Sequence, residues 1–120
     1  MSSADSERLD DAELIWRRIN KLHDLGDGKI SSAAFDDPEM SVDRRQVVES
    51  MGHGVEFTKQ DGVAVAELSV ATVNEIASEC NTDLSAVAKE LPDNAAHALV
   101  LGKKTGGVRK RLRDRSTYLR

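Results

Sequence analysis

The chain has 120 residues, with 17 Lys and Arg against 21 Asp and Glu, and only one Trp, one Tyr and two Phe. This length fits one domain with a modest core. The single Cys80 excludes an internal disulfide and a thiolate metal framework, and the few aromatic side chains argue against a base-stacking surface for single-stranded nucleic acid. No apolar run approaches the ~20 residues that span a bilayer, and the acidic N-terminus lacks an apolar targeting core. We therefore expect a cytoplasmic protein without membrane contact.

The N-terminal part divides into a polar tail and a first ordered element. Residues 1–8 are small and polar, which predicts disorder, and residues 9–120 are expected to form a single α+β domain. Ile15, Ile19 and Leu22 recur at helical spacing, which predicts a helix over residues 11–23. A strand through residues 14–19, "LIWRRI", is the alternative, because short apolar runs do not separate the two periods.

Residues 23–35, "HDLGDGKISSAAF", carry the central part of an EF-hand calcium loop. With Gly28 at loop position 6, Asp27 and Ser31 stand at ligand positions 5 and 9. Positions 1, 3 and 12 then hold His23, Leu25 and Ala34. A single carboxylate does not offset the dehydration of calcium, so we predict a polar turn, no metal site and no cofactor.

The middle of the chain alternates between short strands and helices. Residues 29–35 are expected to form a short strand and residues 36–43 a loop closed by Pro38. The segment 44–51 is predicted to form a short helix that ends at Gly52.

Alternating apolar residues predict a strand over 62–70. Ser69 or Thr72 is expected to open the helix that follows, which should end near Asn81. Residues 84–91 are ambiguous, 92–94 form a turn, and 96–102 form a strand. Together these elements predict a mixed sheet with about three helices.

The C-terminal segment differs from the rest in charge. Residues 1–100 carry 9 basic and 20 acidic side chains, whereas residues 101–120 carry 8 basic side chains and one acidic side chain, Asp114. After Gly106 and Gly107 we expect a basic amphipathic helix whose thin apolar stripe is Val108, Leu112 and Leu119. Such a helix either docks on its own acidic domain or meets an acidic partner. Nucleic acid is expected to bind at most weakly through Arg109, Lys110, Arg111, Arg113 and Arg115.

A few polar residues are candidates for chemistry, although no complete catalytic set can be assigned. His97 begins an apolar strand just after a turn, where a general base or ligand donor is often presented, but a structural histidine is the alternative. Ser31 and Ser32 offer hydroxyl groups without a nucleophile-elbow motif around them. The candidate binding residues are Arg17, Arg18, Asn94, Lys103 and Lys104.

Several short phrases resemble a family of small, uncharacterised prokaryotic single-domain proteins. The phrases span residues 14–19, 31–35, 40–43, 66–68, 93–98 and 102–104. The family's turn reads Asn-Pro-Ala-His-Ala, whereas this chain has Ala95 in the proline position, which leaves the turn less rigid. The resemblance implies that Arg17 or Arg18, Ser31, Ser32 and His97 are signature positions, and it implies no activity.

Two functions follow from these observations. The first is a non-enzymatic interaction or accessory module whose partner is another protein, because no catalytic set is complete and the charge is polarised. The second is a small ligand-binding or transferase-like enzyme that acts on an anionic, nucleotide- or NAD-like substrate. The second function requires the arginines, the serines and His97 to meet in space.

Overall fold

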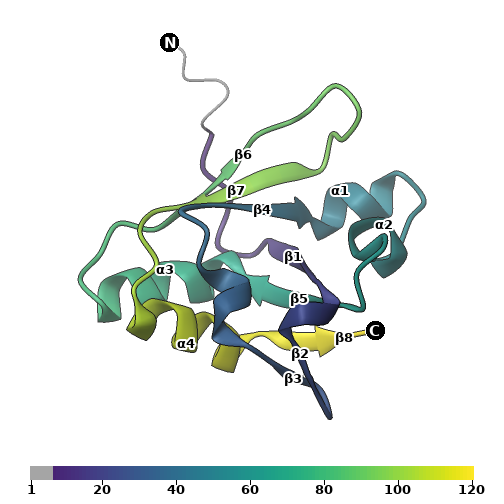
Figure 1. The fold of residues 1–120 in the computed structure, drawn as a ribbon. Coiled ribbons are helices and arrows are strands. Elements are labelled where there is room, and N and C mark those ends of the chain that lie inside the picture. The colour runs from purple at the N-terminus through teal and green to yellow at the C-terminus, as the bar shows by residue number, and fades with distance from the viewer. Residues whose placement is uncertain (1–6) are drawn as a thin grey trace.

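A six-stranded sheet organises residues 7–120, the part of the chain that the computed structural model describes (Figure 1). The strands are β1 (Leu14–Ile19), β2 (Asp24–Gly26), β3 (Lys29–Ile30), β4 (Glu39–Arg44), β5 (Ala64–Ser69), β6 (Ser85–Ala88), β7 (His97–Leu101) and β8 (Thr117–Leu119). The helices are α1 (Arg45–Ser50), α2 (Val55–Lys59), α3 (Val70–Glu79) and α4 (Gly106–Arg115), with short 3-10 helices η2 (Lys21–His23) and η3 (Ser32–Phe35).

The order across the main sheet is β6-β7-β4-β1-β5-β8, while β2 and β3 form a separate hairpin. The predicted α+β class is confirmed. Every strand pairing among the described residues is antiparallel, where a mixed sheet was expected. The same residues hold four α-helices, where about three were expected.

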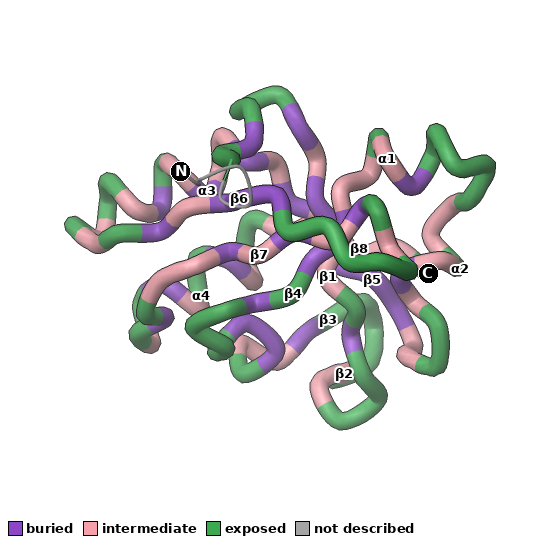
Figure 2. The backbone as a smooth tube through the Cα atoms, turned by 90° about the horizontal axis from the view of Figure 1, so that it is seen from above, coloured by how far each residue is buried: buried purple, intermediate pink, exposed green. Residues whose placement is uncertain are grey.

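One face of the sheet carries the main core. Val42 and Val100 point from β4 and β7 toward α3, α4 and η3, which contribute Val73, Leu112 and Phe35. Figure 2 shows the buried segments along the central strands and the exposed β2–β3 hairpin. Because small and branched side chains fill this layer, the core forms with few aromatic residues.

The opposite face is only partly covered. Trp16, Val48, Val65 and Ala96 form a second buried cluster, against which Phe57 of α2 packs. The helices α1 and α2 cover this end of the sheet. The rest of the face stays open over β4 and β7, and the candidate site lies there.

The prediction of a helix over residues 11–23 is wrong, because residues 14–19 form the central strand β1. Ile15 and Ile19 lie four residues apart, which fits a helix, but this even spacing also places both on one face of a strand. Trp16 is buried on the other face. A strand that is buried on both faces loses the simple alternation that identifies it.

Three shorter segments also differ from the predictions. Residues 39–44 form β4 and not a loop, since Pro38 precedes the strand and removes no hydrogen bond from it. Residues 32–35 form η3 and not a strand. The predicted disordered tail lies mostly outside the described residues. Its last two residues contact β6, where Ala88 N donates to Glu7 O and Arg8 bridges Val87.

The other predicted elements are confirmed by their caps as well as their positions. α1 ends before Gly52, which has the positive φ of 84° that glycine tolerates. α3 begins after Ser69, whose Oγ accepts a hydrogen bond from Thr72 N at 3.0 Å. β7 and the start of α4 also lie where expected.

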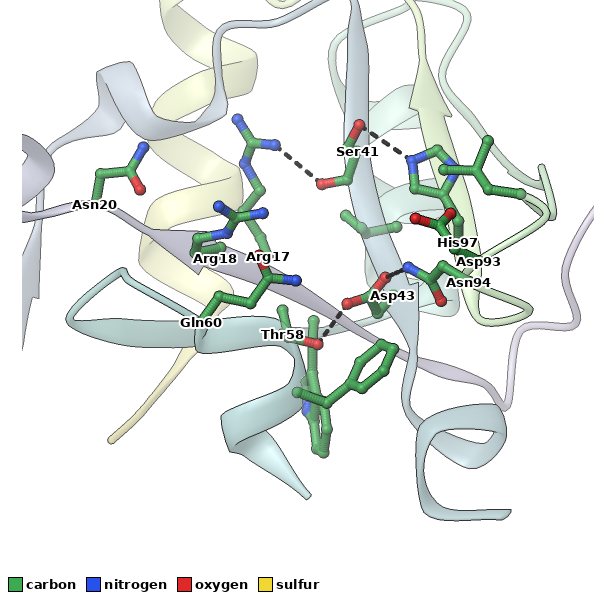
Figure 3. A pocket seen from close by; sticks show the side chains of 14 residues that line it. Arg17, Arg18, Asn20, Ser41, Asp43, Thr58, Gln60, Asp93, Asn94 and His97 are labelled. Carbon is green, nitrogen blue, oxygen red and sulfur yellow. Dashed lines mark hydrogen bonds between the residues drawn. The ribbon is translucent and has the colours of Figure 1, made fainter. Parts of the chain in front are cut away.

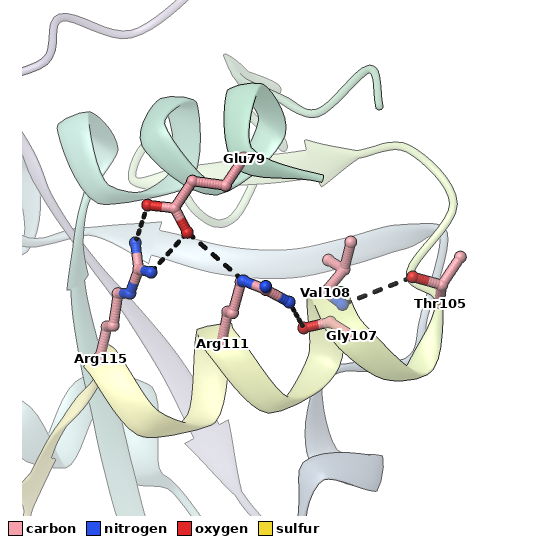
Figure 4. Close-up of polar contacts among 6 residues, drawn as sticks. All are labelled: Glu79, Thr105, Gly107, Val108, Arg111 and Arg115. Atoms are coloured by element: carbon pink, nitrogen blue, oxygen red, sulfur yellow. Dashed lines mark hydrogen bonds and ion pairs between the residues drawn. The ribbon is translucent and has the colours of Figure 1, made fainter. Parts of the chain in front are cut away.

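The basic helix α4 docks on its own domain. Val108 and Leu112 of the predicted stripe are completely buried in the main core, whereas Leu119 lies in strand β8 and not on the helix. Figure 4 shows Glu79 of α3 between Arg111 and Arg115, with the Glu79 carboxylate 3.3 Å from Arg111 Nε. No helix within residues 7–120 is long and apolar enough to cross a membrane.

Candidate functional site

The site begins where the two central strands β1 and β4 part. The strands pair only at Ile15 with Arg44 and at Trp16 with Asp43. At this end the Arg44 guanidinium also holds Glu13 through two hydrogen bonds of 2.8 and 2.9 Å. Beyond Trp16 the main-chain pairing stops, so the strands are joined at one end and open at the other.

The side chain of Arg17 spans the gap between the strands. Its Nη1 donates to the carbonyl of Ser41 on β4 at 2.9 Å, and its Nε donates to the carbonyl of Ala34 in η3 at 3.2 Å. The guanidinium therefore satisfies carbonyl groups that strand pairing leaves free. This contact also sets the position of the Ser41 backbone.

A cavity of about 440 Å³ lies at this parting, within the range of about 300 to 1,000 Å³ that is typical of small-molecule sites. Figure 3 shows Arg17, Arg18 and Gln60 on one side of it and His97 and Asn94 on the other. Its remaining lining residues are Trp16, Asn20, Ser41, Val42, Asp43, Phe57, Thr58, Leu91 and Asp93.

Ser41 and His97 form a hydrogen-bonded pair in the cavity. His97 Nε2 lies 3.2 Å from Ser41 Oγ, and His97 Nδ1 lies 2.8 Å from the carbonyl oxygen of Lys89. A carbonyl only accepts hydrogen bonds, so Nδ1 carries the proton that bonds to Lys89. In the neutral ring, Nε2 then accepts a hydrogen bond from the Ser41 hydroxyl.

Asp43 anchors the floor of the cavity to two other elements. Its carboxylate is buried and accepts hydrogen bonds from Thr58 Oγ1 of α2 at 2.7 Å and from Asn94 Nδ2 of the β6–β7 loop at 3.0 Å. Asn94 Oδ1 in turn accepts from Ala96 N. Because both carboxylate oxygens are occupied, Asp43 holds the loop and α2 against β4.

The two arginines place positive charge on the opposite wall. Burial lowers the pKa of Arg17, and the charge of Arg18 lowers it further, whereas Asp37 and Asp36 raise it. A guanidinium stays charged at neutral pH all the same. Arg18 is exposed, and its one ion pair within residues 7–120 is a 3.4 Å contact with the solvent-exposed Asp61, which is worth little. Its donors are therefore available to a ligand.

The structure brings together only part of the predicted site. Arg17, Arg18, Asn94 and His97 line the cavity. The predicted serines do not, because Ser31 Oγ accepts from Ala33 N at the start of η3 and Ser32 lies within η3.

The two predicted binding lysines also lie elsewhere. Lys104 points into the core, where its Nζ donates to the carbonyls of Val100 and Gly102 at 2.7 Å each. Lys103 is exposed and does not line the cavity. Of these two candidate binding residues, Lys104 therefore has its ammonium group occupied inside the domain.

Sequence reasoning missed Ser41, Asp43 and Thr58. The alternation of buried and polar residues in "MSVD", residues 40–43, was the available signal, since it is typical of a strand with one polar face. The expectation of a loop after Pro38 hid this signal.

The cavity lining contains guanidinium, imidazole, hydroxyl and amide groups, which are able to form hydrogen bonds with a ligand. Within residues 7–120, no three His, Cys, Asp or Glu side chains gather where they could hold a metal ion. Residues 24–30 form the β2–β3 hairpin, whose turn contains Asp27 with φ 55°. No family model, no curated protein and no solved structure matches this chain, so the resemblance to a prokaryotic family remains a prediction.

Proposed function

We propose that the protein binds a small molecule bearing a phosphate or carboxylate group in the cavity between β1 and β4, as a ligand-binding or transferase-like protein. The observation that carries this proposal is that one residue, Ser41, contacts both walls. Its carbonyl accepts from Arg17 and its hydroxyl contacts His97. Arg17, Arg18 and His97 also line this one cavity, which supports the binding of a small anion there.

Charge supports an anion as the ligand. Arg17 and Arg18 are adjacent, and their mutual repulsion is part of what lowers the pKa of Arg17. An anion beside the Arg18 guanidinium offsets this repulsion and accepts charge-assisted hydrogen bonds from Arg18. Phe57, which is only partly buried, adds aromatic surface to the cavity, which fits the base or ring of a nucleotide-like molecule.

Isothermal titration calorimetry with AMP, inorganic phosphate and uncharged adenosine tests this proposal. We expect AMP to bind and adenosine to bind at least tenfold more weakly. Arg18→Gln is expected to weaken AMP binding tenfold or more, because a hydrogen bond to a charged group contributes about 1.5 to 3 kcal/mol. Lys110→Gln is the matched control, since it removes an exposed charge from α4, outside the cavity.

Two results would overturn the proposal. One is that none of the three compounds binds at millimolar concentration. The other is that Arg18→Gln binds AMP as the unsubstituted protein does, which would place any bound anion elsewhere on the surface.

An interaction module is the second candidate, and the β2–β3 hairpin region favours it. The side chains of Leu22 and Leu25 are 86% and 64% exposed, and exposed large apolar side chains contribute to contact surfaces. A protein partner that binds the unsubstituted chain but not a Leu22→Ser, Leu25→Ser variant would support this function. Retained binding by that variant would remove its support.

A further inference from the structure

We propose that Ser41 is a nucleophile and His97 its general base, so that the cavity transfers an acyl group from an ester to Ser41 and then to water. The inference rests on the proposed function only for the negative charge of the substrate. The nucleophile and the base are assigned from their own geometry.

The Lys89 peptide holds the imidazole in the tautomer that a general base requires. Lys89 O accepts from His97 Nδ1 at 2.8 Å, and Lys89 N donates to His97 O at 3.0 Å. The lone pair of Nε2 is therefore directed at the Ser41 hydroxyl 3.2 Å away. The Ser41 hydroxyl, the His97 imidazole and the Lys89 carbonyl therefore form a hydrogen-bonded chain. These are the nucleophile, the base and the group that orients the base, which nucleophilic catalysis by serine requires.

A purely structural role does not account as well for the hydrogen bond between Ser41 and His97. The register of β4 and β7 is already set by five residue pairs, from Glu39 with Leu101 to Asp43 with His97. Ser41 is exposed to solvent at the wall of the cavity, so a hydrogen bond there adds little stability. Its exposure leaves the oxygen accessible to a substrate.

The backbone on both sides of the pair is fixed. Arg17 holds the Ser41 carbonyl. The loop before His97 is closed by reciprocal hydrogen bonds between Leu91 and Asn94, each of 3.0 Å. Asn94 is tied to Asp43. Fixed geometry of this kind lowers the cost of reaching the transition state.

The reaction balances without a further reactant besides water. Ser41 Oγ bonds to the carbonyl carbon of the ester while its proton passes to His97 Nε2. The bond from that carbon to the leaving oxygen then breaks, and the leaving oxygen takes the proton from Nε2. Water repeats the two steps on the acyl-serine, which releases the acid and restores Ser41. The guanidinium of Arg18 lines the same cavity, and its positive charge favours a negatively charged substrate there.

A fluorophosphonate probe tests the nucleophile without knowledge of the substrate. In this reaction Ser41 Oγ bonds to phosphorus, the bond from phosphorus to fluorine breaks, and His97 accepts the serine proton as fluoride leaves. We expect mass spectrometry of the full chain to place the label on Ser41. Ser41→Ala is expected to abolish labelling, and His97→Gln to slow it at least a hundredfold, as loss of a general base does.

Ser78→Ala is the matched control, because Ser78 is an exposed serine on α3 outside the cavity, and it is expected to label at the unsubstituted rate. Thermal melts of each variant establish that it folds. Ser41 that labels no faster than Ser78, or a folded His97→Gln variant that labels at the unsubstituted rate, would overturn the assignment.

AMP binding, measured on the same variants, separates this inference from the proposed function. AMP binding by Ser41→Ala together with absent labelling of the unsubstituted protein would refute the nucleophile and leave the anion site. Rapid labelling of Ser41 without AMP binding would support the nucleophile and refute the anion site.

Discussion

Replacement of Lys104 by methionine tests whether a buried ammonium group opposes folding at neutral pH. The side chain is 5% exposed, and its Nζ contacts the carbonyls of Val100 and Gly102. Burial lowers the pKa of Lys104 from 10.5 to about 8, and the nearby charge of Arg17 lowers it while Asp37 raises it. Lys104→Met keeps an unbranched side chain, shorter by the terminal nitrogen, and removes the titrating group.

The sign of the pH dependence follows from where the proton is held. The unfolded chain keeps the Lys104 proton up to pH 10.5, whereas the folded protein releases it near pH 8. Between these values the unfolded state binds more protons, so the free energy of unfolding rises with pH. With these two values the rise attributable to Lys104 between pH 7 and 9 is ~1.3 kcal/mol. The penalty is fully present below pH 8 and absent above 10.5.

Urea unfolding at pH 7, 8 and 9 measures this contribution. Between pH 7 and 9, we expect the free energy of unfolding of the unsubstituted protein to rise by ~1.3 kcal/mol relative to that of Lys104→Met. Lys103→Met is the control and is expected to follow the unsubstituted protein, because Lys103 is exposed. Parallel curves for Lys104→Met and the unsubstituted protein would refute the reasoning, since they would mean that the two carbonyl bonds offset the burial of the charge.

Three further predictions follow from α4 and from the β2–β3 hairpin. Leu112→Ala is expected to lower the free energy of unfolding by about 2 to 5 kcal/mol, because Leu112 is fully buried. The exposed control Leu22→Ala should change it by less than ~0.5 kcal/mol. Equal losses of unfolding free energy in the two variants, measured by urea unfolding, would contradict this. The intact protein is expected to bind duplex DNA only weakly at physiological salt, because Glu79 pairs with two of the basic side chains of α4. A salt titration of DNA binding measures this. Sub-micromolar affinity with a log-log salt slope near −3.6, the value for about four phosphate contacts, would contradict the prediction. Thermal melts in millimolar calcium and in chelator are expected to coincide. A higher melting temperature in calcium would show that the hairpin binds it, because a ligand at a hundredfold excess over its dissociation constant adds ~2.7 kcal/mol to the free energy of unfolding.

The elements that sequence reasoning predicted correctly are those with a single buried face and a marked end. Helix α3 has Val73 and Ile76 at helical spacing on one buried stripe, and Ser69 caps it. The strand β7 alternates between buried and partly exposed residues from Ala98 to Leu101. In these segments the intrinsic propensity of the residues, the spacing of the apolar residues and the signals at the ends all indicate the same element. A short window of the sequence is therefore enough to predict it.

The elements that were missed depend on contacts from distant parts of the chain. Thr117, Tyr118 and Leu119 continue the pattern of α4 in sequence, but they pair with β5 about fifty residues earlier and form β8. Tertiary pairing of this kind overrides local propensity. The same limit explains the choice of Ser31 in place of Ser41, because the register that brings β4 against β7 is not visible in either segment alone.

Arg17 shows what the sequence nevertheless contains about the site. In a strand, Ile15, Arg17 and Ile19 share one face, and the two isoleucines are buried in the main core. A guanidinium on such a face needs acceptors that the core does not provide, and main-chain carbonyls are available inside a sheet only where strand pairing is interrupted. The contacts of Arg17 with Ser41 O and Ala34 O fit this requirement. A lone arginine on the core face of a central strand thus indicates a break in the sheet, and the candidate site of this protein lies at such a break.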